Sequence, residues 1–108
     1  MDIKTNNTEK NEIAKEGLYS VIDPEIDLNI VDLGLVYEIN FNEESKDIVV
    51  TMTLTTQFCP MGESIVEATT QAMQQSFPEN KIQVNLIFQP PWDQSMISEA
   101  GQTFLNGY

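Results

Sequence analysis

Cys59 is the residue of this sequence best suited to do chemistry. It is the sole cysteine of the chain, and Pro60 follows it directly. Proline favours the first position of a helix, where its missing N–H leaves no hydrogen bond unmade. The spacing therefore predicts that Cys59 caps a helix, where the first-turn amides and the positive helix end favour the thiolate over the thiol.

The overall charge of the chain opposes this effect. Seventeen acidic residues stand against five lysines, for a net charge of −12, and Glu63 follows within the same predicted helix. The helix amides are at contact range, whereas most carboxylates are distant and screened by salt. We therefore expect the local effect to prevail, modestly. The alternative is that Cys59 is a small apolar residue that fills a strand–helix junction.

Two polar residues could act together with this thiol. Thr55 could donate a hydroxyl hydrogen bond toward the sulfur, although threonine is also common in strands for its β propensity. Asp23, which precedes Pro24, could hydrogen-bond its own loop in an Asx turn. It could instead face Cys59 as an oxygen ligand for a metal or as a proton acceptor.

The composition excludes several classes of function. The chain has no histidine and no arginine, so neither a Ser-His nor a Cys-His nucleophile pair can form. Scattered lysines argue against nucleic-acid binding and against anionic membrane surfaces. A single cysteine excludes an internal disulfide and the usual Cys/His zinc site. A free thiol without a secretory signal predicts a cytoplasmic protein.

The hydrophobic pattern predicts a flexible polar leader over residues 1–8 and a single domain over residues 9–108. Apolar residues recur with helical or two-residue spacing through that domain. The predicted elements are a helix Glu9–Ile22, an ordered loop Asp23–Gly34, strands Leu35–Phe41 and Ile48–Leu54, a helix of about Pro60–Phe77, a strand Ile82–Phe88 and a short helix around Met96–Leu105.

These elements predict an α+β fold of two layers, in the order α-β-β-α-β-α. The short loop between the first two strands predicts an antiparallel hairpin, and the strand–helix–strand crossover predicts that the second and third strands are parallel. The result is a three-stranded mixed sheet covered by helices on one face. Alternation places Tyr37 on the covered face, and Val36 and Thr53 on the opposite one.

Two further positions have predicted structural roles. Gly34 is expected to supply a positive φ or a close approach of two backbone segments. Trp92 follows two prolines and is expected to act as a rigid aromatic plug at the edge of the core.

Four short motifs occur in a fixed order along the chain. They are Asp23-Pro24-Glu25, the run Val31–Tyr37, the run Leu54–Pro60, and Pro90-Pro91-Trp92. In this order and spacing the sequence closely resembles the iron-sulfur cluster assembly (FSCA-like) domain family of metal-sulfur cluster biosynthetic proteins, whose members include SufT-like and PaaD-like proteins. The resemblance covers about residues 9–105, and the SufT-like form fits better because the cysteine-rich extension of the PaaD-like branch is absent.

The resemblance implies a factor that helps iron-sulfur client proteins to mature and catalyses no reaction of its own. Cys59 matches the functional cysteine of the family, Thr55 the threonine before it, and Asp23 and Glu25 the acidic pair of the first motif. The resemblance assigns structural roles to the remaining signature positions, which are Asp32, Gly34, Pro60 and Trp92.

One cysteine limits what the chain can hold. An iron-sulfur cluster usually takes four thiolates, so we expect no stably bound cofactor, and at most an iron ion or cluster that Cys59 holds transiently and shares with a partner. Expected partners are iron-sulfur carrier, scaffold or client proteins, and a homodimer could supply a second thiolate. The alternatives are an accessory subunit of a multicomponent ring oxygenase and a thiol-dependent enzyme.

Overall fold

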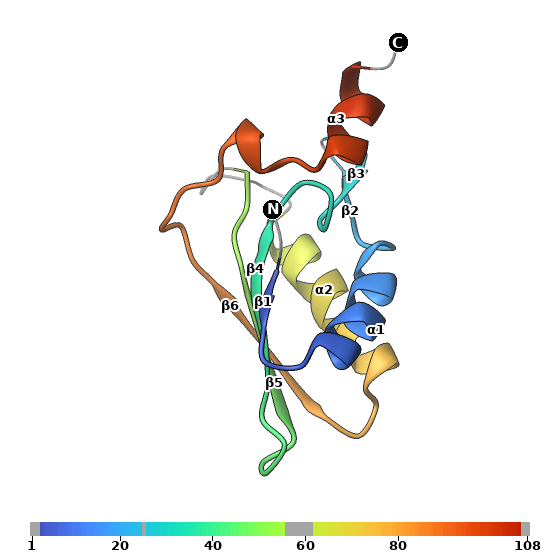
Figure 1. The fold of residues 1–108 in the computed structure, drawn as a ribbon, viewed down its shortest axis with the longest axis vertical. Helices are drawn as coiled ribbons and strands as arrows, with labels where there is room; N and C mark the ends of the chain where they lie inside the picture. Colours follow the sequence, from blue (N-terminus) through green and yellow to red (C-terminus); the bar gives the residue numbers. More distant parts are fainter. Residues whose placement is uncertain (1–2, 25, 56–61, 107–108) are drawn as a thin grey trace.

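The computed structural model of the protein describes residues 3–24, 26–55 and 62–106. Within them, four strands form the main sheet and two form a small antiparallel sheet (Figure 1). The main sheet has the order β1 (Lys4–Thr5), β4 (Val36–Phe41), β5 (Asp47–Met52) and β6 (Lys81–Leu86), and the small sheet pairs β2 (Ile22–Asp23) with β3 (Leu28–Asn29). The helices are α1 (Thr8–Leu18), α2 (Gly62–Ser76), the 3-10 turn η1 (Gln94–Met96) and α3 (Glu99–Asn106).

The predicted α+β class is confirmed. β4 and β5 form the predicted antiparallel hairpin, and β5 pairs with β6 in parallel, as the crossover through α2 requires. The structure adds one strand to the predicted main sheet, because β1 pairs in parallel with β4. Two residues are too few to show a periodic pattern, so the strand had no signal in the sequence. No helix among the described residues is long and apolar enough to cross a bilayer.

β5 lies at the centre of the core. Its three inward side chains, Ile48, Val50 and Met52, have no exposed surface. α1 and α2 lie side by side over this face of the sheet (Figure 1). The two helices approach closely at Gly17, where an added Cβ would lie 2.7 Å from the Ser76 hydroxyl.

α1 begins at Thr8, one residue before the predicted start, and ends earlier than predicted. The side chain of Asn7 accepts a hydrogen bond from the Lys10 backbone N–H at 3.0 Å, which caps the first turn. The helix ends at Leu18 rather than at Ile22, because Ile22 enters β2 and pairs with Asn29. The predicted helix end was wrong, and Ile22 is 47% exposed instead of buried.

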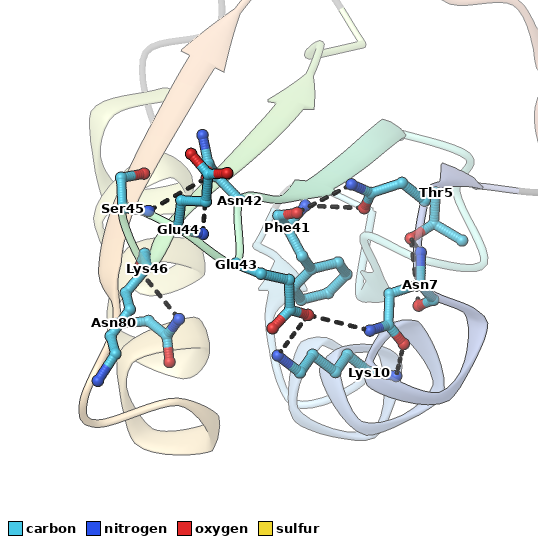
Figure 2. A network of polar contacts seen from close by, with 11 residues as sticks. Thr5, Asn7, Lys10, Phe41, Asn42, Glu43, Glu44, Ser45, Lys46 and Asn80 are labelled. Atoms are coloured by element: carbon cyan, nitrogen blue, oxygen red, sulfur yellow. Dashed lines mark hydrogen bonds and ion pairs between the residues drawn. The ribbon is translucent and has the colours of Figure 1, made fainter.

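The N-terminal residues are fixed to the β4–β5 hairpin by polar contacts (Figure 2). The side-chain amide of Asn6 donates to the Phe41 carbonyl at 2.8 Å and accepts from the Phe41 N–H at 2.9 Å, as a neighbouring strand would. Lys10 donates to the Glu43 carboxylate at 2.9 Å, and this hydrogen bond lowers the pKa of Glu43. The contacts hold β1 and the start of α1 against the hairpin.

A register shift in β4 changes which residues are buried. Val36 pairs with Met52, but Ile39 pairs with Val50, so one extra residue lies between the two pairs on β4. Such a bulge moves side chains to the other face of a strand. Val36 therefore shares the covered face with Met52 and is only 4% exposed, so its predicted outward orientation was wrong.

Tyr37 and Thr53 lie beside this bulge and are both buried. Thr53, predicted to point to solvent, has no exposed surface. The Tyr37 hydroxyl donates to the Pro90 carbonyl at 2.9 Å, so the segment after β6 passes over this part of the sheet. Burial raises the pKa of Tyr37, and a side-chain hydrogen bond with Thr53 partly opposes that shift.

The predicted loop between α1 and β4 contains the β2–β3 sheet. The Asp23 carbonyl accepts from the Asp27 N–H at 2.8 Å and closes the turn between the strands. α3 packs near this sheet, at the end of the molecule and away from α1 and α2 (Figure 1). Gly101 of α3 lies so close to Leu28 that an added Cβ would be 3.0 Å from the leucine Cδ2.

Replacing Asn6 tests how β1 is held. Asn6→Ala removes both hydrogen bonds to the Phe41 backbone and is expected to lower the free energy of unfolding by about 1–2 kcal/mol. Urea unfolding measures the loss, and hydrogen exchange of the Phe41 amide should speed up. The matched control is Asn40→Ala, which changes an exposed asparagine of β4 directly before Phe41. Equal effects of the two substitutions would contradict this role for Asn6.

The raised pKa of Tyr37 predicts a loss of stability in alkali. Since the folded state favours the neutral phenol, the unfolded chain releases this proton first, and the free energy of unfolding falls as pH rises above about 10. Tyr37→Phe should make this fall shallower, while it costs about 1 kcal/mol at neutral pH through the hydrogen bond lost to Pro90. Unfolding measured from pH 8 to 11 tests the effect, with the exposed Tyr19→Phe as control. Parallel curves for wild type and Tyr37→Phe would refute it.

Candidate functional site

The motif cysteine lies between β5 and α2. Cys59 and Pro60 are outside the described residues, so the predicted helix cap and the predicted helix start at Pro60 stay predictions. The flanking elements have the predicted order, with β5 ending at Met52 and α2 described from Gly62. Thr55 is half-buried and follows the last residues of β5.

The end of β5 is held firmly on both sides. Beyond the strand, the Thr53 N–H donates to the Leu35 carbonyl at 2.8 Å. On the other side, the Ile87 N–H donates to the Met52 carbonyl at 2.9 Å. The chain therefore enters the motif from a backbone that is fixed to both neighbouring segments.

Asp23 differs from the other acidic residues that the structure describes, because it alone is buried. Its exposed fraction is 1%, whereas each of the others keeps a substantial part of its surface in water. It lies in β2, opposite Leu28. A carboxylate removed from water is costly unless polar groups stabilise it, so the burial marks Asp23 as a position under a specific constraint. Glu25, its predicted partner, lies outside the described residues.

The candidate residues come from two different sheets. Asp23 belongs to the small β2–β3 sheet, and Thr55 follows β5 of the main sheet. In the part of the chain that the structure describes, no three acidic or cysteine side chains form a group that could hold a metal ion.

Three signature positions meet at one junction between the β3–β4 turn and the segment before α3. Asp32 accepts hydrogen bonds from the side chains of Asn29, at 2.7 Å, and Ser98, at 2.8 Å. Its carbonyl also accepts from the Ser98 N–H at 2.7 Å. Asp32 thus joins its own turn to the start of α3.

Gly34 and Trp92 complete this junction. Gly34 has a φ of 77°, in the left-handed region, and an added Cβ would lie 2.9 Å from the Met96 carbonyl carbon. The Trp92 indole N–H donates to the Leu33 carbonyl at 2.7 Å, and the half-buried ring packs against the core. The two motifs that contain these residues are therefore in direct contact.

Sequence reasoning missed two residues at this junction. Ser98 binds Asp32, Met96 contacts the backbone near Gly34, and the sulfur of Met96 lies 3.7 Å from the Tyr37 hydroxyl oxygen. Contacts over such long separations in sequence leave no local pattern. The sequence offered one local signal here, the pair Ser98-Glu99 before the last helix. A serine at that place indicates the start of a helix and does not indicate a contact with Asp32.

Gly34→Ala tests the junction. The substitution forces a left-handed backbone on alanine and drives its methyl group into Met96, so the free energy of unfolding should fall by about 1–3 kcal/mol. Asp27→Gly is the control, because Asp27 also has a positive φ, of 63°, but is exposed. It should change stability by less than about 1 kcal/mol. Urea unfolding followed by circular dichroism measures both, and a tolerated Gly34→Ala would contradict the close approach.

Comparison with known proteins identifies relatives across most of the chain. Residues 14–86 match the model of a family described as iron-sulfur cluster assembly protein. The chain is 40% identical to the Fe-S protein maturation auxiliary factor SufT of Staphylococcus aureus, over 79% of this chain and 96% of that protein. It is 38% identical to the Fe-S protein maturation auxiliary factor YitW of Bacillus subtilis, over 82% of this chain and 85% of that one.

A solved structure shows the same fold. The crystal structure of a domain of unknown function, DUF59, from Bacillus anthracis is 36% identical and superimposes with a TM-score of 0.83, covering 91% of this chain and 92% of that one. The family match covers both strands of the β4–β5 hairpin, α2 and β6, and includes the Leu54–Pro60 motif. The resemblance predicted from the four motifs is thus confirmed, and the chain belongs to the iron-sulfur cluster assembly protein family.

Proposed function

We propose that this protein is an auxiliary factor in the maturation of iron-sulfur proteins, with Cys59 as its functional residue. The observation that carries the proposal is the 40% identity to a relative named as such a factor, across 96% of that relative's length. Cys59 is the one thiol of the chain, and thiolates are the ligands that iron-sulfur clusters take.

The ligand count favours transfer over storage. A cluster usually takes four thiolates and this chain has one cysteine. Any further thiolate must come from another molecule, such as a carrier, a scaffold, a client or a second copy. Asp23 and Glu25 are the proposed oxygen donors of this chain. The cluster or iron is then cargo held for a short time, and the protein needs no catalytic step of its own.

The donors that could stabilise a thiolate at the motif are backbone amides and a hydroxyl rather than cations. The sequence places Cys59 just before α2, and the amides of a helix N-terminus stabilise an anion. The only charged residues of α2 are the acidic Glu63 and Glu67, so no lysine of that helix contributes to the stabilisation of a thiolate. Backbone amides and the Thr55 hydroxyl are the donors that we propose for it.

Substitution of Cys59 tests the proposal in cells. In a strain that lacks this protein, the wild-type gene should restore the activity of iron-sulfur enzymes, and Cys59→Ala should leave it at the level of the deletion strain. Cys59→Ser should also fail, because a hydroxyl does not replace the soft thiolate. Equal thermal unfolding of the purified variants shows that folding is not the cause. Full restoration by Cys59→Ala would refute the role of the thiol.

Anaerobic reconstitution with iron and sulfide separates transfer from storage. If the thiol is shared, the purified wild type should retain far less than one cluster per chain in its visible and Mössbauer spectra, and Cys59→Ser should retain less still. A stoichiometric cluster that depends on Cys59 would instead indicate a stable carrier. Glu44→Gln, an exposed change on the β4–β5 turn, is the control.

A further inference from the structure

An apolar groove lies between the start of α2 and the end of β6. It has a volume of about 510 Å³. Its walls are apolar side chains together with two glutamates of α2, and these residues are Leu54, Val66, Leu86, Phe88, Glu63 and Glu67. Gly62 also lines it, and an added Cβ there would lie 2.7 Å from the Leu54 Cδ1, so a side chain at this position would displace Leu54. We call it the β6 groove.

Leu86 is the inward-facing residue of β6 that the fold leaves exposed. Alternation predicts that Ile82, Val84 and Leu86 all face the helices, and the first two are half-buried. Leu86 is 40% exposed. The strand therefore presents an apolar side chain to solvent where it borders the groove.

The backbone beside the groove is also available for pairing. Among the strands that the structure describes, β6 is at the edge of the sheet, with β5 on one side (Figure 1). The N–H groups of Lys81 and Ile87 donate toward the β5 side, to the carbonyls of Lys46 and Met52. In a parallel pair, alternate residues bond to the same neighbour. The N–H and C=O groups of Ile82, Val84 and Leu86 therefore point away from the sheet.

The charge around the groove has one sign. Glu63 and Glu67 are exposed, and α2 carries no lysine or arginine. Lys81 is at the opposite end of β6 from Leu86. A segment that enters the groove next to these carboxylates gains from positive charge, and an acidic segment is repelled.

We propose that the β6 groove and the outer edge of β6 bind an extended segment of a partner protein, in which lysine or arginine lies two residues before or after an apolar side chain and therefore on the same face of the strand. The segment adds a strand to β6, its apolar side chain fills the groove against Leu86, and its cations face Glu63 and Glu67. A second copy of this chain is a poorer occupant, since each copy carries a net charge of −12. The inference concerns protein recognition, and it stands whether or not Cys59 transfers iron.

A peptide of known sequence tests the proposal. The probe is a nine-residue peptide with lysine at positions 3 and 7, leucine at position 5 and threonine elsewhere, so that both lysines and the leucine share one face of the strand. Its partner probe has glutamate in place of every lysine. The lysine peptide should bind the full chain in isothermal titration calorimetry, more weakly as salt is added. It should also shift the NMR amide signals of Ile82, Val84 and Leu86. The glutamate peptide should not bind.

Charge reversal locates the binding site. Glu63→Lys with Glu67→Lys should weaken binding of the lysine peptide by about tenfold or more. Glu16→Lys with Glu44→Lys changes the net charge equally on exposed residues of α1 and the β4–β5 turn. This control should weaken binding less than about threefold, through long-range charge alone. Leu86→Ser should also weaken binding.

Three results would overturn the proposal. Equal losses of peptide affinity in the two charge-reversed variants would mean that the peptide is attracted by the overall charge of the protein and not by Glu63 and Glu67. Amide shifts confined to residues outside β6 and α2 would place the peptide elsewhere. Sedimentation of the protein alone as a dimer, dissociated by Leu86→Ser, would show that a second copy covers the groove. None of these results depends on iron-sulfur enzyme activity, so failure of the docking site and failure of the proposed function are distinguishable.

Discussion

The burial of one face of β5 is the constraint on which the rest of the structure depends. Ile48, Val50 and Met52 are fully removed from water, and the strand is hydrogen-bonded to β4 on one side and to β6 on the other. Such a strand cannot slide by one residue without turning its apolar side chains to solvent. Its end is therefore a fixed point, and the motif that carries Cys59 starts from it. Under the proposed function, in which the Cys59 thiol meets a partner's iron, such a fixed origin would help to position the thiol.

The main sheet and the two covering helices were largely predictable, because their signals are local. Alternating side chains define β5 and β6, and helical spacing defines α2. The β4 bulge was not predictable, since one extra residue changes the face of Val36 without changing the local pattern. The predicted end of α1 was wrong for a related reason. Helical spacing continues to Ile22, but strand pairing between Ile22 and Asn29 overrides it.

The site shows the same division between local and distant signals. The motifs identified the family, and they marked Asp32, Gly34 and Trp92 as positions to examine. What those residues do depends on partners far along the chain, such as Ser98 and Met96, and no spacing rule reveals them. Two motifs that look separate in the sequence form one junction, which ties the β3–β4 turn to the segment that leads into α3. The first motif lies close in sequence to this junction, so the buried Asp23 and the C-terminal segment share one supporting region.

The junction also gives this protein a natural optical reporter. Trp92 is the sole tryptophan of the chain, its indole N–H is hydrogen-bonded to the Leu33 carbonyl at 2.7 Å, and its ring is half-buried against the core. Indole emission responds to solvent polarity, so detachment of the C-terminal segment would redshift the fluorescence while β5 stays intact. Far-ultraviolet dichroism follows the helices and strands instead. Comparing the two signals during denaturation would reveal whether the α3 end and the sheet melt as one cooperative unit.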